Sequence, residues 1–173
     1  MERLQVKIKR LHPDAVIPQY AYEGDAGFDL VAVEDVVVEP GETVKVPTGI
    51  AIELPSGYEL QVRPRSGISL RTKLRVVLGT VDAGYRGEIG VIVDNIASEQ
   101  YYTYKQYFEL LTTEGERIDA KYPYWEGTYI IRKGDRIAQA VIKSVEQAHF
   151  IEVGELDDSE RGEGGFGSTG IKF

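Results

Sequence analysis

Apolar and polar side chains alternate along the first third of the chain, and turn residues interrupt the alternation. In residues 36–46 the apolar side chains lie on both sides of Pro40-Gly41, and in residues 50–62 they lie on both sides of Pro55-Ser56-Gly57. Alternation with a period of two places every second side chain on one face of a β-strand. Each of these segments therefore predicts two strands joined in a hairpin.

The same alternation returns later in the chain. Ile89, Val91 and Val93 are separated by single residues, and residues 137–142 form another apolar stretch. Residues 1–95 contain no convincing segment with the period of a helix. Short strands separated by proline and glycine turns are typical of an all-β barrel or a double-sheet jelly roll, which is the fold class that we predict.

Residues 97–127 break this rhythm, and we interpret them as an insertion. They contain six of the eleven tyrosines and Trp125, the only tryptophan. The periodicity of residues 104–111 fits one or two helical turns as well as an extended hairpin, so it does not decide between them. We predict a β-barrel domain at residues 1–156 that includes this insertion.

The last segment, residues 157–173, is polar and rich in glycine. It has little apolar surface to pack, so we predict a flexible arm that orders around a ligand. The alternative is a tail that stays disordered.

The composition is that of one globular domain with an acidic surface. The chain has 173 residues and a formal net charge of −8, and this length suits a single domain with a hydrophobic core. An acidic surface repels phosphate backbones and anionic lipids, so we expect neither a nucleic acid nor a membrane as partner. No apolar run approaches the ~20 residues that span a bilayer, and the first residues lack the core of a signal peptide. We expect a soluble cytoplasmic protein.

Cysteine is absent, and the only histidines are His12 and His149. Disulfides, thiolate metal sites and cysteine nucleophiles are therefore excluded, and a histidine-based metal site or triad is disfavoured. A metal ion would have oxygen ligands, which favours Mg²⁺. The candidate carboxylates are Asp25 and Asp29, which lie four residues apart in a glycine-containing loop that leads into a predicted strand.

Two segments carry groups that bind phosphate. In residues 63–70, Arg65 is followed by Ser66 and Gly67, so a guanidinium, a hydroxyl and exposed backbone N–H groups occur together. In residues 161–170, glycines allow the backbone to approach anionic oxygens closely. This second segment lacks the GK[ST] sequence of a P-loop, so we exclude a P-loop ATPase. The alternatives are an exposed turn and a disordered tail, respectively.

Residues 79–90 carry the candidate catalytic group. Asp82 lies in a turn between apolar segments, where a carboxylate can orient a water molecule for attack. Tyr85 follows three residues later and can pack against a sugar. The alternative is that Asp82 only caps its own turn. Farther along, Arg136 and Gln139 lie on a predicted strand, and we interpret Arg136 as a structural ion-pair partner.

Five of these segments occur in one order: DAGFDL, PRSGISL, GTVDAGYRGEIG, KGDRIAQAVI and RGEGGFGSTG. They span residues 25–170 and resemble the five ordered motifs of the trimeric dUTPase family. The resemblance implies a jelly-roll β-barrel, a homotrimer with three sites at subunit interfaces, and a C-terminal arm that closes over the active site. It also implies Mg²⁺-dependent hydrolysis of dUTP to dUMP and pyrophosphate, which keeps uracil out of DNA and supplies dUMP for thymidylate synthesis.

The resemblance also implies roles for individual residues. Asp82 would position the attacking water, Tyr85 would pack under the sugar and exclude a 2′-hydroxyl, and Asp29 would hold Mg²⁺ through water. The uracil edge would be read by backbone groups of Gly79, Thr80, Val81 and Gly90. The phosphates would be held by Arg65, Ser66, Gly67 and Gln139. The arm would grip the γ-phosphate and cover the base with Arg161, Phe166, Gly167, Ser168 and Thr169.

Two features depart from the common pattern of this family. Many cellular members have an asparagine before the third motif that helps to bind uracil, whereas Leu78-Gly79 forms a shorter connection here. Residues 97–127 resemble the extra segment of some phage-encoded dUTPases, certain of which bind a repressor protein. We therefore hypothesise a phage origin, the host cytoplasm as location, and a repressor or other protein as a partner of residues 97–127.

Two other functions stay open at this point. A dCTP deaminase-like enzyme has the same fold and would use a glutamate near the cytosine amine, for which Glu88 is the nearest candidate. A nucleotide-switched signalling protein would use the aromatic insertion as its docking surface, since tyrosine and tryptophan are enriched at hot spots of interfaces. The alternative for these aromatic side chains is that they pack against the trimer itself.

Overall fold

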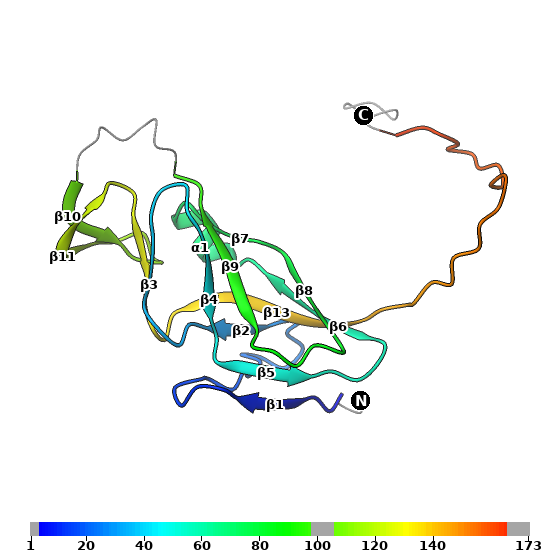
Figure 1. The fold of residues 1–173 in the computed structure, drawn as a ribbon, viewed down its shortest axis with the longest axis horizontal. Coiled ribbons are helices and arrows are strands. Elements are labelled where there is room, and N and C mark those ends of the chain that lie inside the picture. The colour runs from blue at the N-terminus through cyan, green and yellow to red at the C-terminus, as the bar shows by residue number, and fades with distance from the viewer. Residues whose placement is uncertain (1–3, 98–105, 166–173) are drawn as a thin grey trace.

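The structure is a computed structural model that describes residues 4–97 and 106–165. In these residues it contains thirteen strands and one short helix (Figure 1). The strands are β1 (Lys7–Arg10), β2 (Phe28–Val31), β3 (Val36–Val38), β4 (Thr43–Pro47), β5 (Ile50–Glu53), β6 (Tyr58–Arg63), β7 (Leu74–Val76), β8 (Gly79–Asp82), β9 (Gly90–Asn95), β10 (Gln106–Leu111), β11 (Arg117–Trp125), β12 (Tyr129–Ile131) and β13 (Arg136–Ser144). The helix, α1, comprises Ser66–Arg71. No helix in this part of the chain is long and apolar enough to cross a membrane. The predicted all-β class is confirmed.

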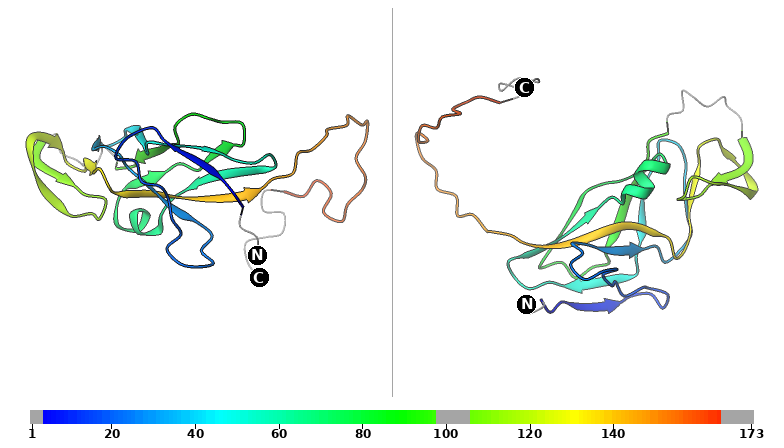
Figure 2. Two further views of the ribbon diagram at one scale, coloured as in Figure 1. Left: turned by 90° about the horizontal axis from the view of Figure 1, so that it is seen from below. Right: turned by 180° about the vertical axis from the view of Figure 1, so that it is seen from behind.

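The strands form four sheets around an apolar core. The strand orders are β1-β5, β11-β10-β12-β3, β2-β13-β6-β8 and β4-β9-β7. Strands far apart in the sequence lie side by side, since β13 pairs antiparallel with both β2 and β6. Figure 2 shows β13, in yellow to orange, running along the body of the molecule.

The core is built from the alternating apolar side chains. In β9, Val91 and Val93 are buried, whereas Ile92 between them is 46% exposed. In β6, Leu60 and Val62 are buried in the same alternation. Burial of this apolar surface is the main favourable contribution to folding, so the pattern read from the sequence corresponds to the interior of the fold.

The two predicted hairpins are wrong, although both turns are present. β3 and β4 flank Pro40-Gly41 but pair with β12 and β9, respectively, and β5 and β6 also pair with other strands. Gly41 and Gly57 have φ angles of 78° and 83°, a left-handed conformation that suits glycine in a turn. The turn residues reverse the direction of the chain, but they do not decide which strands pair. Each strand pairs where its apolar face is buried, so the two strands that flank a turn belong to different sheets.

A single short helix positions the predicted phosphate-binding segment. Arg65 precedes α1 with an extended backbone, and Ile68 is buried against the core. The hydroxyl and the N–H of Thr72 both donate to the Ile68 carbonyl, at 2.7 and 3.0 Å, and end the helix. Ser66 and Arg71, at the two ends of α1, both line the larger cavity described below.

The described part of the insertion is a hairpin, so the extended alternative is correct. β10 and β11 are antiparallel, with a register shift between Tyr107 and Glu109. In their turn, the Thr112 N–H donates to the Glu116 carbonyl at 2.9 Å. Arg117 on β11 lies 2.7 Å from Glu109 on β10, and this hydrogen bond raises the pKa of Arg117 above its usual value.

The chain leaves the body after β13. Residues 145–165 contain no helix or strand, and they extend away from the sheets (Figure 1). Phe150 and Leu156 in this stretch are 90% and 88% exposed. The division into a domain at residues 1–156 and an arm at residues 157–173 stays a prediction.

Asn95 joins the base of the insertion to the sheets and provides a test of stability. Its side chain is buried; Nδ2 donates to the carbonyls of Val38 and Gly127 at 3.0 and 2.9 Å, and Oδ1 accepts from the Ala97 N–H at 3.1 Å. Asn95→Leu leaves three backbone groups without these partners, so we expect the free energy of unfolding to fall by about 3 kcal/mol. Denaturant unfolding at fixed protein concentration measures this change.

The control for this prediction is Thr43→Val, which removes an exposed hydrogen bond between neighbouring strands. We expect this control to change the free energy of unfolding by less than about 0.5 kcal/mol. An equally small change in Asn95→Leu would contradict the role given to Asn95.

Candidate active site

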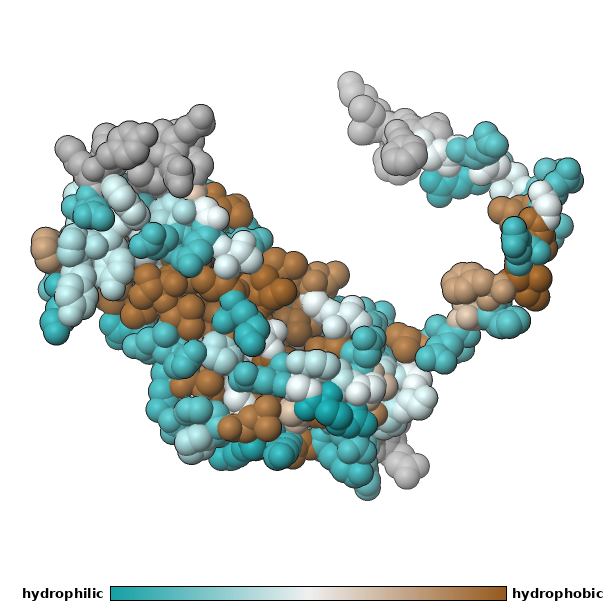
Figure 3. All heavy atoms as spheres, in the orientation of Figure 1, coloured by the Kyte–Doolittle hydropathy of each residue, from teal (hydrophilic) through white to brown (hydrophobic). Residues whose placement is uncertain are grey.

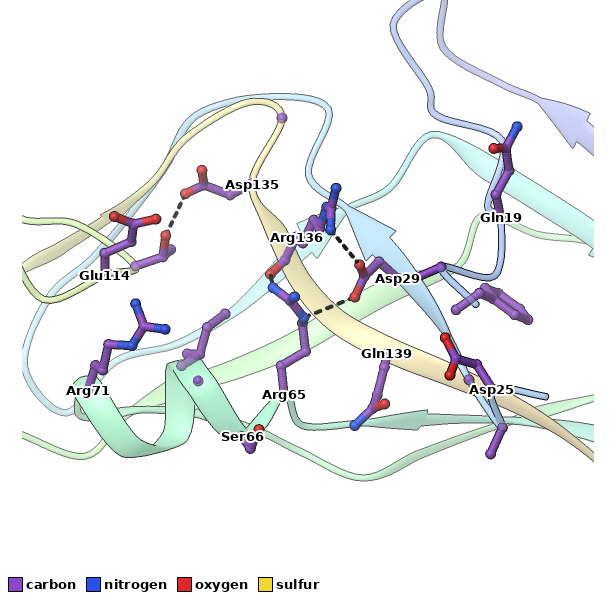
Figure 4. Close-up of a pocket in the computed structure, with 18 residues that line it drawn as sticks. Gln19, Asp25, Asp29, Arg65, Ser66, Arg71, Glu114, Asp135, Arg136 and Gln139 are labelled. Carbon is purple, nitrogen blue, oxygen red and sulfur yellow. Dashed lines mark hydrogen bonds and ion pairs between the residues drawn. The ribbon is translucent and has the colours of Figure 1, made fainter. Parts of the chain in front are cut away.

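A cavity of about 780 Å³ lies where β2, β13, α1 and the turn between β10 and β11 meet (Figure 4). Segments that are distant in the sequence supply its lining. The side chains labelled in Figure 4 are Gln19, Asp25, Asp29, Arg65, Ser66, Arg71, Glu114, Asp135, Arg136 and Gln139. Most of the chemical groups singled out in the first, second and fourth motifs therefore share one site.

Asp29 on β2 joins two arginines at the centre of this cavity. Its Oδ1 lies 2.9 Å from Arg65 Nε, and its Oδ2 lies 3.3 Å from Arg136 Nη1. Arg65 also donates from Nη1 to the backbone carbonyl of Arg136 at 2.9 Å. The carboxylate thus orients both guanidinium groups, and Arg136 is the ion-pair partner that the sequence suggested.

The other phosphate-binding candidates lie along the same wall. Ser66 and Gly67 line the cavity beside Arg65, and Gln139 lines it from β13. The Gln139 side chain donates from Nε2 to the Pro64 carbonyl at 2.9 Å, which ties β13 to the segment before α1. The fold therefore brings these four candidates together with Asp29.

The charges of the lining nearly balance. Three arginines and four carboxylates leave one net negative formal charge; they are Arg65, Arg71, Arg136, Asp25, Asp29, Glu114 and Asp135. Among residues 4–97 and 106–165 no group of three or more side chains forms a ready metal site. Mg²⁺ is usually held by one or two carboxylates, water and substrate phosphates rather than by an all-protein cage. The donor set therefore fits a Mg²⁺ that binds together with a polyphosphate.

A second cavity, of about 200 Å³, lies beside β8 and the start of β9. It is lined by Thr80, Val81, Asp82, Tyr85, Glu88, Ile89 and Gly90. The Tyr85 hydroxyl donates to the Glu88 carbonyl at 3.0 Å, and a Cβ atom at Gly87 would overlap the Tyr85 ring. Glycine at position 87 is therefore what allows the ring to lie across this turn. This cavity is thus lined by residues of the third motif, including the candidate catalytic Asp82.

Glu88, the candidate residue for a deaminase, holds the backbone of a neighbouring segment. Its Oε1 accepts a hydrogen bond from the Gly49 N–H at 2.7 Å. Gly49 has a φ of 67°, and a Cβ atom there would lie 2.8 Å from His12 Cβ. One oxygen of Glu88 thus stabilises a tightly packed turn before β5.

The two cavities are separated along β6. Asp82 lies opposite Glu59 in the antiparallel pair of β6 and β8, and Arg65 follows Glu59 by six residues. Because a strand rises about 3.3 Å per residue, the backbones of Asp82 and Arg65 are on the order of 20 Å apart. The two sets of lining residues have no member in common. Within one chain, the candidate catalytic carboxylate is therefore not brought to the phosphate-binding residues.

The remaining predicted residues lie elsewhere. Gly79 belongs to β8 but does not line the second cavity. Arg161 lies in the exposed stretch after β13, where its Nε donates to the Gly164 carbonyl at 2.6 Å. The predictions for Phe166, Gly167, Ser168 and Thr169 fall outside the described residues.

Sequence reasoning missed several residues of the larger cavity, among them Gln19, Arg71, Thr113 and Glu114. Arg71 follows directly after the segment at residues 63–70, and it could have been found by assuming a helix there, because residues four apart on a helix are neighbours. Thr113 and Glu114 carry no such signal. The turn of an inserted hairpin has no local feature that says which surface it will meet.

The chain matches the model of the dUTPase family over residues 14–107 and 124–170. The unmatched residues 108–123 lie within the hairpin of β10 and β11. The deoxyuridine 5′-triphosphate nucleotidohydrolase of Thermobifida fusca is 50% identical over 169 residues, which cover 96% of this chain and 79% of the relative.

Two phage proteins have closely similar structures. The dUTPase of Staphylococcus bacteriophage 80alpha with dUPNHPP has a TM-score of 0.90 at 36% identity, covering 96% of this chain and 99% of that chain. Phage dUTPases of this kind control the transfer of virulence genes by a proto-oncogenic G protein-like mechanism. A variant of the dUTPase from phage phi11 of S. aureus, which coordinates a structural Mg(II) ion, has a TM-score of 0.85 at 30% identity, covering 89% of this chain and 99% of that chain.

Proposed function

Since this chain belongs to the dUTPase family, whose members are enzymes that hydrolyse dUTP, we propose that it performs this reaction at sites shared between the copies of a homotrimer. The products would be dUMP and pyrophosphate. The observation that carries the shared site is the separation of Asp82 from Arg65 within one chain. A complete site then requires the small cavity of one copy to face the large cavity of another.

In this shared site, positioning and electrostatics supply most of the catalysis. Asp82 of one copy orients a water molecule and accepts its proton as the water attacks the α-phosphorus. Arg65, Ser66 and Gly67 of another copy hold the phosphates, with Gln139 beside them, and the guanidinium stabilises the negative charge that develops on the phosphate oxygens. Asp29 contributes by orienting Arg65.

The small cavity suits the nucleoside. Its backbone edge is formed by Thr80, Val81 and Gly90, and its sugar-facing wall by Tyr85. The tyrosine ring is held by its hydrogen bond to the Glu88 carbonyl, so it presents a fixed surface that a 2′-hydroxyl would meet. Gly79 extends the same strand edge toward the base. These features support selection of a deoxyuridine nucleotide.

Mg²⁺ is the cofactor that the charge balance supports. A lining with one net negative charge does not by itself neutralise a triphosphate. Asp29 would hold the ion through water, because both of its oxygens contact arginines. When bound, Mg²⁺ would neutralise phosphate charge. The structural Mg(II) ion of the phi11 relative is a precedent for this metal in the family.

Two exposed apolar features support a trimer. Figure 3 shows apolar side chains gathered over the sheet that contains β9, and the exposed members there are Val77, Leu78, Ile92 and Ile96. Phe150 and Leu156 in the stretch after β13 are almost fully exposed. Large exposed apolar patches usually mark interaction sites. We infer that both surfaces are covered by other copies, and that residues 157–173 form an arm that closes a site.

A second candidate function is binding of a protein partner through the insertion. Tyr107, Phe108, Tyr122 and Trp125 of β10 and β11 are all exposed, and exposed aromatic side chains suit an interface. The virulence-gene control described for the phage relatives supports a partner of regulatory type. With a phage origin, the enzyme would act in the host cytoplasm, where it would lower dUTP and supply dUMP.

The proposed reaction is tested with purified protein, Mg²⁺ and two nucleotides. We expect dUTP to yield dUMP and pyrophosphate, and dCTP to release no ammonia. Chelation of Mg²⁺ is expected to reduce turnover by about two orders of magnitude, because the metal supplies several kcal/mol of charge stabilisation. Pyrophosphate release and ammonia release are measured in parallel. Ammonia from dCTP, or unchanged dUTP, would reject the proposal in favour of a deaminase or of a protein with no hydrolytic activity.

A further inference from the structure

The turn of the insertion hairpin forms part of the wall of the larger cavity, which we propose to hold the phosphates. Thr113 and Glu114 both line this cavity. The Thr113 hydroxyl donates to Asp135 Oδ2 at 3.0 Å, and the same oxygen accepts from the Arg132 N–H at 3.0 Å. This hydrogen bond joins the insertion to the turn that precedes Arg136. The hairpin turn is therefore anchored to the site rather than free above it.

The hairpin turn also lies against the end of α1. A Cβ atom built on Gly115, which has a φ of 83°, would lie 2.8 Å from the Arg71 carbonyl oxygen. Only a residue without a side chain allows this approach. The backbones of the insertion and of α1 are thus in close contact at one end of the cavity.

Arg71 is a cation of the cavity that finds no partner in the described part of the chain. Arg65 and Arg136 both pair with Asp29, whereas within the described ranges the Arg71 guanidinium has no hydrogen-bond or ion-pair partner. Its Nη2 would lie 3.4 Å from a Cβ atom built on Gly67. This guanidinium is therefore next to the segment that holds phosphates and is available to another anionic oxygen.

Glu114 lies at the same end of the cavity as Arg71. Figure 4 shows both side chains at this end, separated from each other, and the two groups form no ion pair within 4.0 Å. A phosphate that reaches Arg71 also comes close to this carboxylate. Arg71 would attract such a phosphate and Glu114 would repel it.

From this arrangement we propose that Arg71 and Glu114 form a subsite for the terminal phosphates of the substrate. Arg71 increases the affinity for these phosphates, and Glu114 reduces it. The inference rests on the proposed hydrolysis of dUTP. In that function Arg65, Ser66 and Gly67 hold phosphates of the substrate, and Arg71 lies next to Gly67. We therefore assign the end of the cavity walled by the hairpin to the phosphates farthest from the nucleoside. Limited affinity there favours release of pyrophosphate, which must leave before the next turnover.

Isothermal titration of the complete protein with Mg²⁺ tests this subsite, with dUPNHPP, pyrophosphate and dUMP as probes. Arg71→Gln is expected to raise the Kd of dUPNHPP and of pyrophosphate about tenfold, which is the usual loss for a hydrogen bond to a charged group. Glu114→Gln is expected to lower both constants about threefold, by removing a repulsive charge in a partly solvated site. Neither substitution touches the nucleoside cavity, so the Kd of dUMP should change by less than about twofold.

The matched controls remove the same charges outside the cavity. Arg10→Gln lies on exposed β1, and Glu116→Gln lies two residues beyond Glu114 in the same turn without lining the cavity. Both controls should leave all three constants unchanged. Arg71→Lys keeps the positive charge and should recover part of the affinity for dUPNHPP and pyrophosphate. It therefore separates the loss of the charge from a structural disturbance at this position.

Several results would overturn the subsite. One is an unchanged Kd of dUPNHPP in Arg71→Gln, and another is a Kd of dUMP that rises as much as that of dUPNHPP in the same variant. The third is a higher Kd of pyrophosphate in Glu114→Gln. A wild-type protein that leaves dUTP intact rejects the proposed function instead. Normal wild-type turnover combined with an unaffected Arg71→Gln variant rejects only the subsite.

Discussion

Asp82→Asn is expected to reduce the turnover of dUTP by about 10³-fold while the Kd of dUPNHPP changes by less than about threefold. The substitution keeps the size of the side chain but replaces the carboxylate, which can accept a proton from water, with an amide that cannot. Asp82 lies at the end of β8 and lines the smaller cavity, away from the residues proposed to hold the phosphates, so we expect its loss to act on the chemical step rather than on phosphate binding. Pyrophosphate release and isothermal titration measure the two quantities.

The control for Asp82→Asn is Asp94→Asn, which changes a carboxylate that accepts a hydrogen bond from Thr43 and lines neither cavity. It should retain wild-type turnover. If Asp82→Asn turned over dUTP as fast as this control, Asp82 would only cap its own turn, as the sequence alone allowed.

Asp29→Asn is expected to lower kcat/KM for dUTP by about 10²-fold. The carboxylate lies 2.9 Å from Arg65 and 3.3 Å from Arg136, so the amide removes the charge that orients both guanidinium groups. It also removes the group proposed to hold the hydrated Mg²⁺. The measurement is kcat/KM over a series of Mg²⁺ concentrations.

Glu34→Gln is the control for Asp29→Asn, because this exposed carboxylate follows β2 but does not line the cavity. Its kcat/KM should match the wild type. Equal values for Asp29→Asn and the control would mean that neither the orientation of the arginines nor the metal depends on Asp29.

Asp29→Asn and Asp82→Asn together test the shared site. Asp29 and Asp82 line different cavities of one chain. In a mixed trimer, an intact large cavity of one copy can meet an intact small cavity of another, so unfolding and refolding a mixture of Asp29→Asn and Asp82→Asn should restore part of the activity. A mixture that stays as inactive as its components would place each site within one chain.

The position of the hairpin turn changes how the insertion can be studied. The aromatic side chains Phe108 and Tyr122 are exposed on its strands, as expected for a docking surface. Thr113 and Glu114 nevertheless line the larger cavity. Removing the whole insertion would therefore alter both the proposed phosphate site and the proposed docking surface. Substitutions of single aromatic residues separate the two roles.

Local features of the sequence were sufficient for most strands that form the core. Side chains alternate across a strand whatever its partner is, so Val91 and Val93 could be assigned to the core before any sheet was known. Glycine conformations at Gly41 and Gly57 likewise depend on their own turns. Composition excluded thiolate chemistry and disfavoured a histidine-based site, and the order of the five motifs predicted the family that the dUTPase match confirms.

Only the tertiary structure decided which strands pair and which functional groups meet. β3 and β4 are adjacent in sequence but belong to different sheets, since strand partners are chosen by burial over long sequence distances. The same packing pairs Arg65 with Asp29, leaves Arg71 without an ion-pair partner among residues 4–97 and 106–165, and brings Glu114 from an inserted hairpin to the same cavity. Electrostatic compensation depends on distances in space, and the spacing of residues along the chain does not contain those distances.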